Sequence, residues 1–135
     1  MSRHDFPAGR VCLMALAVSL VLGLLFAGQA FGAINTTGNV TPDPTTTTSG
    51  VSLYVGDTAD GTMTVDGGSD VDSALGTIGA DPGVIGTATV SGAGSTWTTS
   101  MEMYVGHQGT GALNIQNGGA VSNGVGYLGY FSGAA

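Results

Sequence analysis

The stretch GTMTVDGG at positions 61–68 returns as GTATVSGA at 86–93 and as GALNIQNG at 111–118, each time 25 residues further on. Apolar and polar residues alternate inside each copy, as in Met63 and Val65 between threonines, which is the periodicity of a β-strand with one buried face. The glycines that follow supply the backbone freedom that tight turns need. A unit of about 25 residues is therefore the structural repeat of this chain.

A longer repeat of 50 residues runs through the same region without a gap, since residues 53–83 align with residues 103–133. The two aligned segments share glycines at the expected turns and aliphatic residues between these glycines. Three short strands per unit, with like residues at fixed spacing, predict an all-β fold, a parallel β-helix of three to four coils over residues 51–135. A closed β-barrel or sandwich is the competing fold, but it would not by itself require a constant period.

Residues 1–30 have the order of a secretory signal peptide: a charged start, an apolar run at 11–28 and small residues after it. We expect a helical signal peptide at 1–30, cleaved after Ala30 or Gly32, and contact with the membrane only through it during export. A retained membrane anchor is the alternative, because the apolar run approaches the roughly 18–20 residues that span a bilayer.

Residues 31–50 are rich in Thr, Pro, Asn and Gly and show no apolar periodicity from position 34 onward. This composition predicts a disordered, exposed linker between the signal peptide and the repeats.

Charge and cysteine content exclude several functions. Arg3, Arg10 and Cys12 all lie in the predicted signal peptide, so the rest of the chain holds no Lys, Arg or Cys. Without cationic side chains nothing can pair with a phosphate backbone, which excludes nucleic acid as a partner. Recognition of phosphorylated or carboxylate substrates through arginine is excluded for the same reason. Disulfides and thiol chemistry are also absent from residues 31–135.

The first half of the repeat region is rich in aspartate, which raises the question of calcium, a cation that takes six to eight oxygen ligands. The D-x-[DN]-x-[DN]-G loop does not occur. Three of these aspartates fall at expected turns and are not repeated in the next long repeat: Asp66, Asp70 and Asp72 become Gln116, Ala120 and Ser122. We interpret them as solvated turn residues, assign no metal ligand or cofactor, and leave open whether calcium stabilises the coils.

His107 replaces Asp57 of the preceding long repeat, and no second histidine lies in residues 31–135. We interpret it as a lone, exposed turn residue. Paired carboxylates of the glycosidase type are not excluded by the sequence, but polysaccharide-cleaving β-helices usually add basic residues to their acids. We therefore assign no catalytic residue and expect no enzymatic activity.

The segment VSGAGSTW at 90–97 is superficially similar to a glycine-rich phosphate loop. A Walker-type loop needs a lysine and a following helix, and a G-x-G-x-x-G fingerprint must open a helix, so neither fits here. Its glycines lie where a strand ends and turns, and Trp97 lies near the start of the next strand. We expect Trp97 to be buried in the core of its coil.

Aromatic residues gather in the repeats at Tyr54, Tyr104, Tyr127, Tyr130 and Phe131, and the first two of these occupy the same repeat position. They could form an aromatic binding stripe. Columns of like side chains are also how solenoids pack, and we favour this structural interpretation.

The pattern YVG at 104–106, GTGALNIQNGGAV at 109–121 and VSGAGSTW at 90–97 resembles the type V secretion and PEP-CTERM-associated repeat of exported bacterial surface proteins. The resemblance covers about residues 51–133. It implies a β-solenoid stalk or passenger region, displayed by an autotransporter barrel or processed at a C-terminal anchor. Neither is found in this sequence, so we expect it to be a fragment of a longer protein.

These features predict a non-enzymatic structural or adhesin-like repeat segment of an exported bacterial protein, located outside the cell or on its outer surface. A surface polysaccharide or a host or matrix ligand is the expected partner. The alternative is a fragment of a polysaccharide-active β-helix enzyme, whose acidic residues would cluster on one lateral face.

The sequence stops within a coil, and an uncapped solenoid end exposes unpaired strand edges. We therefore expect residues 31–135 alone to self-associate or unfold. Light scattering after gel filtration, together with thermal unfolding, tests this expectation. A monodisperse monomer that melts in one cooperative transition would contradict it.

Overall fold

The computed structural model describes residues 32–45 and 49–131. The predicted signal peptide, its membrane-anchor alternative and Cys12 lie outside these residues. Within the described part all regular structure is β-strand. No helix there is long and apolar enough to cross a membrane.

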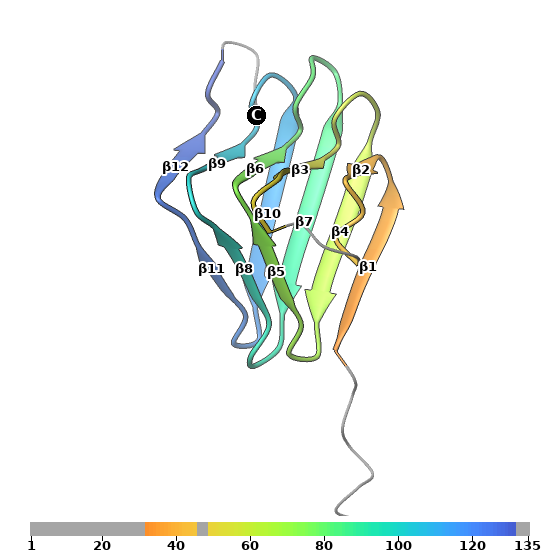
Figure 1. Cartoon of the computed structure of the whole chain (residues 1–135). Coiled ribbons are helices and arrows are strands. Elements are labelled where there is room, and N and C mark those ends of the chain that lie inside the picture. Colours follow the sequence, from red (N-terminus) through yellow and green to blue (C-terminus); the bar gives the residue numbers. More distant parts are fainter. Residues whose placement is uncertain (1–31, 46–48, 132–135) are drawn as a thin grey trace, which may run out of the picture. The chain divides into compact units, whose positions relative to one another are not determined.

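The described strands form three sheets (Figure 1), with the orders β1-β4-β7-β10, β11-β8-β5 and β12-β9-β6-β3-β2. The strands are β1 (Ala33–Gly38), β2 (Val40–Thr41), β3 (Ser52–Val55), β4 (Gly61–Asp66), β5 (Asp70–Ser73), β6 (Leu75–Ile78), β7 (Ile85–Ser91), β8 (Thr96–Thr99), β9 (Glu102–Val105), β10 (Thr110–Gln116), β11 (Ala120–Ser122) and β12 (Val125–Leu128).

Three successive coils, β4-β5-β6, β7-β8-β9 and β10-β11-β12, lie one on another. Each strand pairs in parallel with its counterpart in the next coil. The fold is therefore a parallel β-helix of about three turns, which confirms the fold class that the repeat predicts.

The constant period of the sequence holds only in the first sheet, where Gly61, Gly86 and Gly111 are register partners. In the five-stranded sheet the steps between register partners are alternately shorter and longer than this period, along the column Val55, Ile78, Val105 and Leu128. The middle coil has one extra residue in each of its first two turns. The connection at 79–84 is longer than the one at 106–109, and this difference restores the register.

A glycine with positive φ follows each member of that column and begins the connection to the next coil. These residues are Gly56, Gly79, Gly106 and Gly129, with φ of 75°, 70°, 74° and 63°. The left-handed region is accessible to glycine without steric cost. A Cβ at Gly79 would in addition meet the carbonyl oxygen of Thr110, so this turn has neither the conformation nor the space for a side chain.

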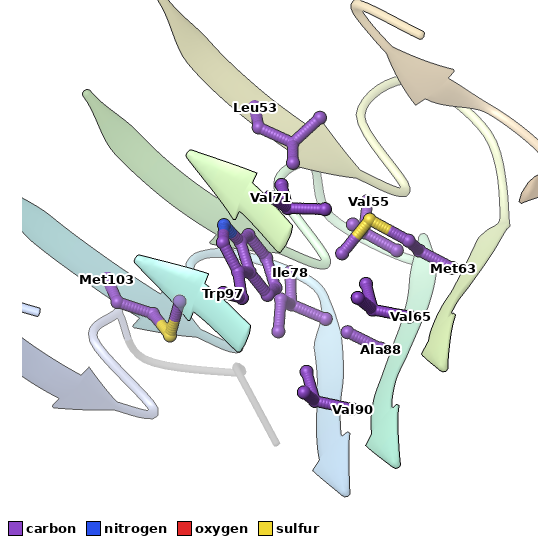
Figure 2. Packing of buried hydrophobic residues seen from close by; sticks show 10 residues of the cluster. All are labelled: Leu53, Val55, Met63, Val65, Val71, Ile78, Ala88, Val90, Trp97 and Met103. Atoms are coloured by element: carbon purple, nitrogen blue, oxygen red, sulfur yellow. The ribbon is translucent and has the colours of Figure 1, made fainter. Parts of the chain in front are cut away.

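Inward-facing side chains form columns that run through the coils, such as Met63-Ala88-Leu113 and Val65-Val90-Ile115. Figure 2 shows ten of the buried side chains pointing toward one another between the strands. Alternate residues of β4 and β7 are buried, as the apolar and polar alternation predicts.

Trp97 is fully buried in this core, which confirms the prediction made for it. Its indole N–H donates a hydrogen bond to the Ser73 hydroxyl at 3.1 Å. Gly76 makes room for the ring, because a Cβ there would lie 3.0 Å from Cζ2 of Trp97 and 3.2 Å from Cε of Met103. The largest side chain of the core thus depends on a glycine in the neighbouring coil.

Part of the predicted linker is not disordered, which corrects the sequence analysis. Strands β1 and β2 pair antiparallel with β4 and β3 and cover one end of the β-helix (Figure 1). Ile34 lies opposite Val65 and Val40 opposite Val55, and both pack against the core. Two isolated apolar residues produce no periodicity, which is why composition alone predicted a linker here.

At the other end, β10, β11 and β12 have no further strand beside them within the described residues. Their inward-facing side chains are therefore uncovered. Ile115 is 50% exposed and Leu128 83%, whereas the column mates Val90 and Ile78 are fully buried.

Removal of the Ser73 hydroxyl tests the packing around Trp97. We expect Ser73→Ala to lower the free energy of unfolding by about 1–3 kcal/mol, because the buried indole N–H would lose its acceptor. Thr98→Ala, at an exposed site on the same strand as Trp97, should change it by less than about 0.5 kcal/mol. Denaturation followed by Trp97 fluorescence measures both variants, and equal losses would contradict the assigned role.

Candidate functional site

The outward face of β9 and β12 carries two stacked tyrosines. Met103 and Val105 of β9 point inward, so Tyr104 between them points outward, and Tyr127 is its register partner on β12. The two ring centroids lie 4.8 Å apart with the planes only 11° from parallel. Parallel pairing brings equivalent side chains to about the strand spacing of 4.7–4.9 Å, which is also a stacking distance for aromatic rings.

Stacked turns bring three more rings to these tyrosines. The His107 N–H donates to the carbonyl oxygen of Gly79 at 3.0 Å, and the Phe131 N–H donates to that of His107 at 3.1 Å. Consecutive turns therefore lie over one another. His107 stacks on Tyr130 at 5.7 Å between ring centroids and meets Phe131 edge-on at 4.9 Å.

We call these five residues the aromatic cluster: Tyr104, His107, Tyr127, Tyr130 and Phe131. Seven ring pairs join them, with centroid distances from 4.7 to 5.7 Å. Tyr130 and Phe131 are nearly half exposed, and the other three are partly buried. Each such pair contributes about 0.5–1.5 kcal/mol beyond its buried area, so the cluster fixes its own geometry while leaving ring surface in contact with solvent.

Partial burial raises the pKa of Tyr104, and the negative charge of Glu102 adds to this shift, followed by Tyr127 and Tyr130. Tyr104 therefore keeps its proton through the physiological range. The neutral hydroxyl can both donate and accept a hydrogen bond.

Three of the aspartates tie neighbouring strands to the first coil through hydrogen bonds. Carboxylate oxygens of Asp66 and Asp60 accept the N–H groups of Ala33 at 3.2 Å and Ile85 at 2.8 Å. Asp70 accepts the Thr96 hydroxyl at 2.7 Å. These bonds tie strands β1, β7 and β8 to the first coil.

All three of the predicted turn aspartates lie in strands instead. Asp66 ends β4, whereas Asp70 begins β5 and Asp72 lies within it, both exposed, because the turn after β4 ends at residue 69. Among the described residues, no group of three or more His, Cys, Asp or Glu residues is placed to hold a metal ion.

The 90–97 segment is a structural turn between β7 and β8. The Ser95 hydroxyl donates to the carbonyl oxygen of Ser91 at 2.7 Å and accepts the N–H of Gly68, in the equivalent turn of the preceding coil, at 3.0 Å. Ser95 is buried, and its N–H donates to the Gly92 carbonyl. These groups are engaged within the protein, so the turn serves coil stacking.

The structure brings together four of the five aromatic residues that the sequence analysis named. Tyr54 is separated from Tyr104, because Thr77 occupies the position between them in the ladder β3-β6-β9. His107 is not the lone turn residue that was expected, since it packs against Tyr104, Tyr130 and Phe131. In the sequence, an aliphatic residue followed by glycine recurs unevenly, at 55–56, 78–79, 105–106 and 128–129, and this spacing was the signal that could have placed Tyr104 beside Tyr127.

Comparison with known proteins assigns this chain to no family. No family model matches the sequence. Searches of curated proteins and of solved structures find no significant match either. The resemblance to type V secretion and PEP-CTERM-associated repeats therefore stays a hypothesis.

Titration of Tyr104 should couple to stability at alkaline pH. Because its pKa is raised in the folded state, its contribution is fully present below the unfolded pKa of about 10 and is lost as pH rises through the folded pKa. We expect Tyr104→Phe to weaken the fall of the melting temperature between about pH 9 and 11. Tyr54→Phe is the control, and an identical pH dependence in both variants would contradict this coupling.

Proposed function

We propose that this chain is a non-enzymatic repeat segment of an exported bacterial protein, and that its aromatic cluster binds a neutral polysaccharide at the cell surface. The observation that carries the proposal is the gathering of five rings on one side of a regular β-helix, with Tyr130 and Phe131 nearly half exposed. The resemblance to surface-protein repeats supports the exported location.

Aromatic rings suit polysaccharide because the C–H faces of a sugar ring pack against the electron-rich face of an aromatic ring. Tyrosine hydroxyls and the histidine ring nitrogens can bond to sugar hydroxyls at the rim of the same surface. The rings of the cluster hold one another through mutual contacts, so little side-chain freedom remains to be lost on binding.

Charge favours a neutral polysaccharide over an acidic one. The sequence has no Lys or Arg after Arg10, while seven aspartates and Glu102 lie in residues 43–102. An acidic polysaccharide would meet repulsion and find no cation to pair with. A neutral one requires only stacking and hydrogen bonds.

A β-helix is also suited to a structural role, because each coil contacts only its neighbours and the same columns can continue from one coil to the next. The hydrogen-bonded ladders and the buried columns make such a segment a stiff support for a binding surface. We propose that projection and adhesion are combined in this way.

An enzyme is less well supported. Asp70 and Asp72 share the outward face of β5, but the aromatic cluster lies on the outward face of a different sheet and in its turns. Asp70 is already bonded to Thr96. We therefore propose binding without cleavage.

Binding to insoluble cellulose and chitin tests the proposal, with alginate as the acidic comparison. We expect retention on a neutral polysaccharide, and Tyr127→Ala should weaken it roughly 2- to 12-fold, the equivalent of about 0.5–1.5 kcal/mol for a lost aromatic contact. Tyr54→Ala is the matched control, because Tyr54 lies in the same outward column but outside the cluster.

Trp97 emission shows whether both variants stay folded, since the chain's single tryptophan is fully buried. Equal weakening by Tyr127→Ala and Tyr54→Ala, or retention on alginate alone, would overturn the proposed binding surface. Release of reducing sugars by the unmodified protein would favour the enzyme instead.

A further inference from the structure

The outward face of the sheet β1-β4-β7-β10 carries short, uncharged side chains. Met63 and Val65 of β4 and their counterparts in β7 point into the core, so the residues that alternate with them point outward. Figure 1 shows the four strands side by side. Eight outward residues, which we call the threonine face, form two columns across these strands: Thr37, Thr62, Thr87 and Ala112, and beside them Asn35, Thr64, Thr89 and Asn114.

Threonine recurs on this face more strictly than strand formation requires. The triplet TMT at 62–64 becomes TAT at 87–89, so both outward threonines stay while the inward residue between them changes. Valine, isoleucine and tyrosine also favour strands, but none of them occupies any of the eight positions. In the second sheet, by contrast, the outward threonines of β8 lie opposite aspartates of β5. Pairs of threonines stacked on pairs of threonines are therefore particular to the first sheet within the described part of the chain.

The threonine face is regular in two directions. Register partners on neighbouring strands lie about 4.7–4.9 Å apart, and alternate residues along a strand lie about 6.6 Å apart, twice the rise of about 3.3 Å per residue. The β-branched side chain of threonine has few accessible rotamers, so its hydroxyl and methyl groups are held with little freedom. The face is therefore a fixed lattice of hydroxyl and methyl groups.

The chemistry of this lattice disfavours most macromolecular partners. Protein partners are usually anchored by tryptophan, tyrosine or arginine, and none of these occurs at the eight positions. The aspartates at its margins, Asp60 and Asp66, each accept a backbone N–H, from Ile85 and Ala33. A sugar ring would find no aromatic ring to stack on, unlike at the aromatic cluster. The matching ligand is therefore uncharged, rigid and itself periodic in two dimensions.

A hollow of about 270 Å³ lies against the first of the two columns, with Thr37, Thr62, Thr87 and Ile85 among its lining residues. It has room for several water molecules, since each takes about 30 Å³ in the liquid. A threonine hydroxyl both donates and accepts hydrogen bonds, so it can hold water on the lattice of the face.

We propose that the threonine face binds ice. Oxygen atoms in the planes of an ice crystal repeat at distances of similar size to the two spacings of this face. Water molecules held by the threonine hydroxyls therefore continue the order of the crystal, while the methyl groups between them exclude freely moving water. This activity uses a different sheet from the aromatic cluster and does not depend on the binding of polysaccharide.

Partition into slowly growing ice tests the proposal on the full chain, recovered after export from an expression host. Growing ice excludes ordinary solutes, so the measured quantity is the protein concentration in the ice relative to that in the remaining liquid. We expect the chain to be enriched in the ice and Thr62→Tyr to abolish the enrichment, because a protruding ring keeps the crystal away from the neighbouring threonines.

Thr98→Tyr is the matched control. Thr98 is also an exposed outward threonine, but it lies on β8 in the second sheet, so its replacement should leave the enrichment unchanged. Circular dichroism and the emission of the buried Trp97 show whether each variant is folded. If Thr62→Tyr does not fold, Thr87→Tyr in the next coil takes its place.

Tyr127→Ala separates this proposal from polysaccharide binding. It should weaken retention on polysaccharide and leave the partition into ice unchanged, whereas Thr62→Tyr should do the reverse. Exclusion of the unmodified chain from ice, or equal losses in Thr62→Tyr and Thr98→Tyr, would overturn the proposal. Retention on cellulose that Thr62→Tyr abolishes, without enrichment in ice, would show that the face binds polysaccharide and would overturn it as well.

Discussion

Parallel pairing between successive coils is the constraint on which the rest of this structure depends. Once β4, β7 and β10 lie side by side in register, every inward position is stacked between equivalent positions about 4.8 Å away. The side-chain volumes must therefore fit one another from coil to coil along each column, as well as within a single coil. Ala88 lies between Met63 and Leu113 in one column, and Gly76 leaves the space that Trp97 fills. A stack of this kind can hold one very large side chain only where a neighbouring coil supplies a very small one.

The same constraint explains how much could be predicted from the sequence. The constant period of Met63, Ala88 and Leu113 predicts the first sheet and with it the fold class, because equal offsets place equal faces inward. It does not predict the unequal steps of the sheet that carries Tyr104, since these depend on the lengths of the turns. Strands β1 and β2 escaped prediction for another reason: Ile34 and Val40 become strand residues only because a finished coil offers them an edge.

The aromatic cluster could be predicted from the sequence only in part. Tyr104 and Tyr127 could be recognised as strand residues, but their contact requires the shortened step from β9 to β12. His107, Tyr130 and Phe131 lie in or beyond turns, where neither strand periodicity nor composition fixes a direction. Hydrogen bonds between consecutive turns place them, and such bonds exist only once the coils are stacked. A surface made by stacked turns is therefore visible in a structure and nearly invisible in a sequence.

The aromatic cluster links the fold to the proposed role. Parallel stacking places Tyr104 and Tyr127 about one strand spacing apart, and hydrogen bonds between consecutive turns bring His107, Tyr130 and Phe131 to them. The rings therefore come from successive coils, so the contacts that stabilise the stack also build the proposed binding surface. A substitution that shifts one coil against the next would accordingly alter that surface without changing any of its rings.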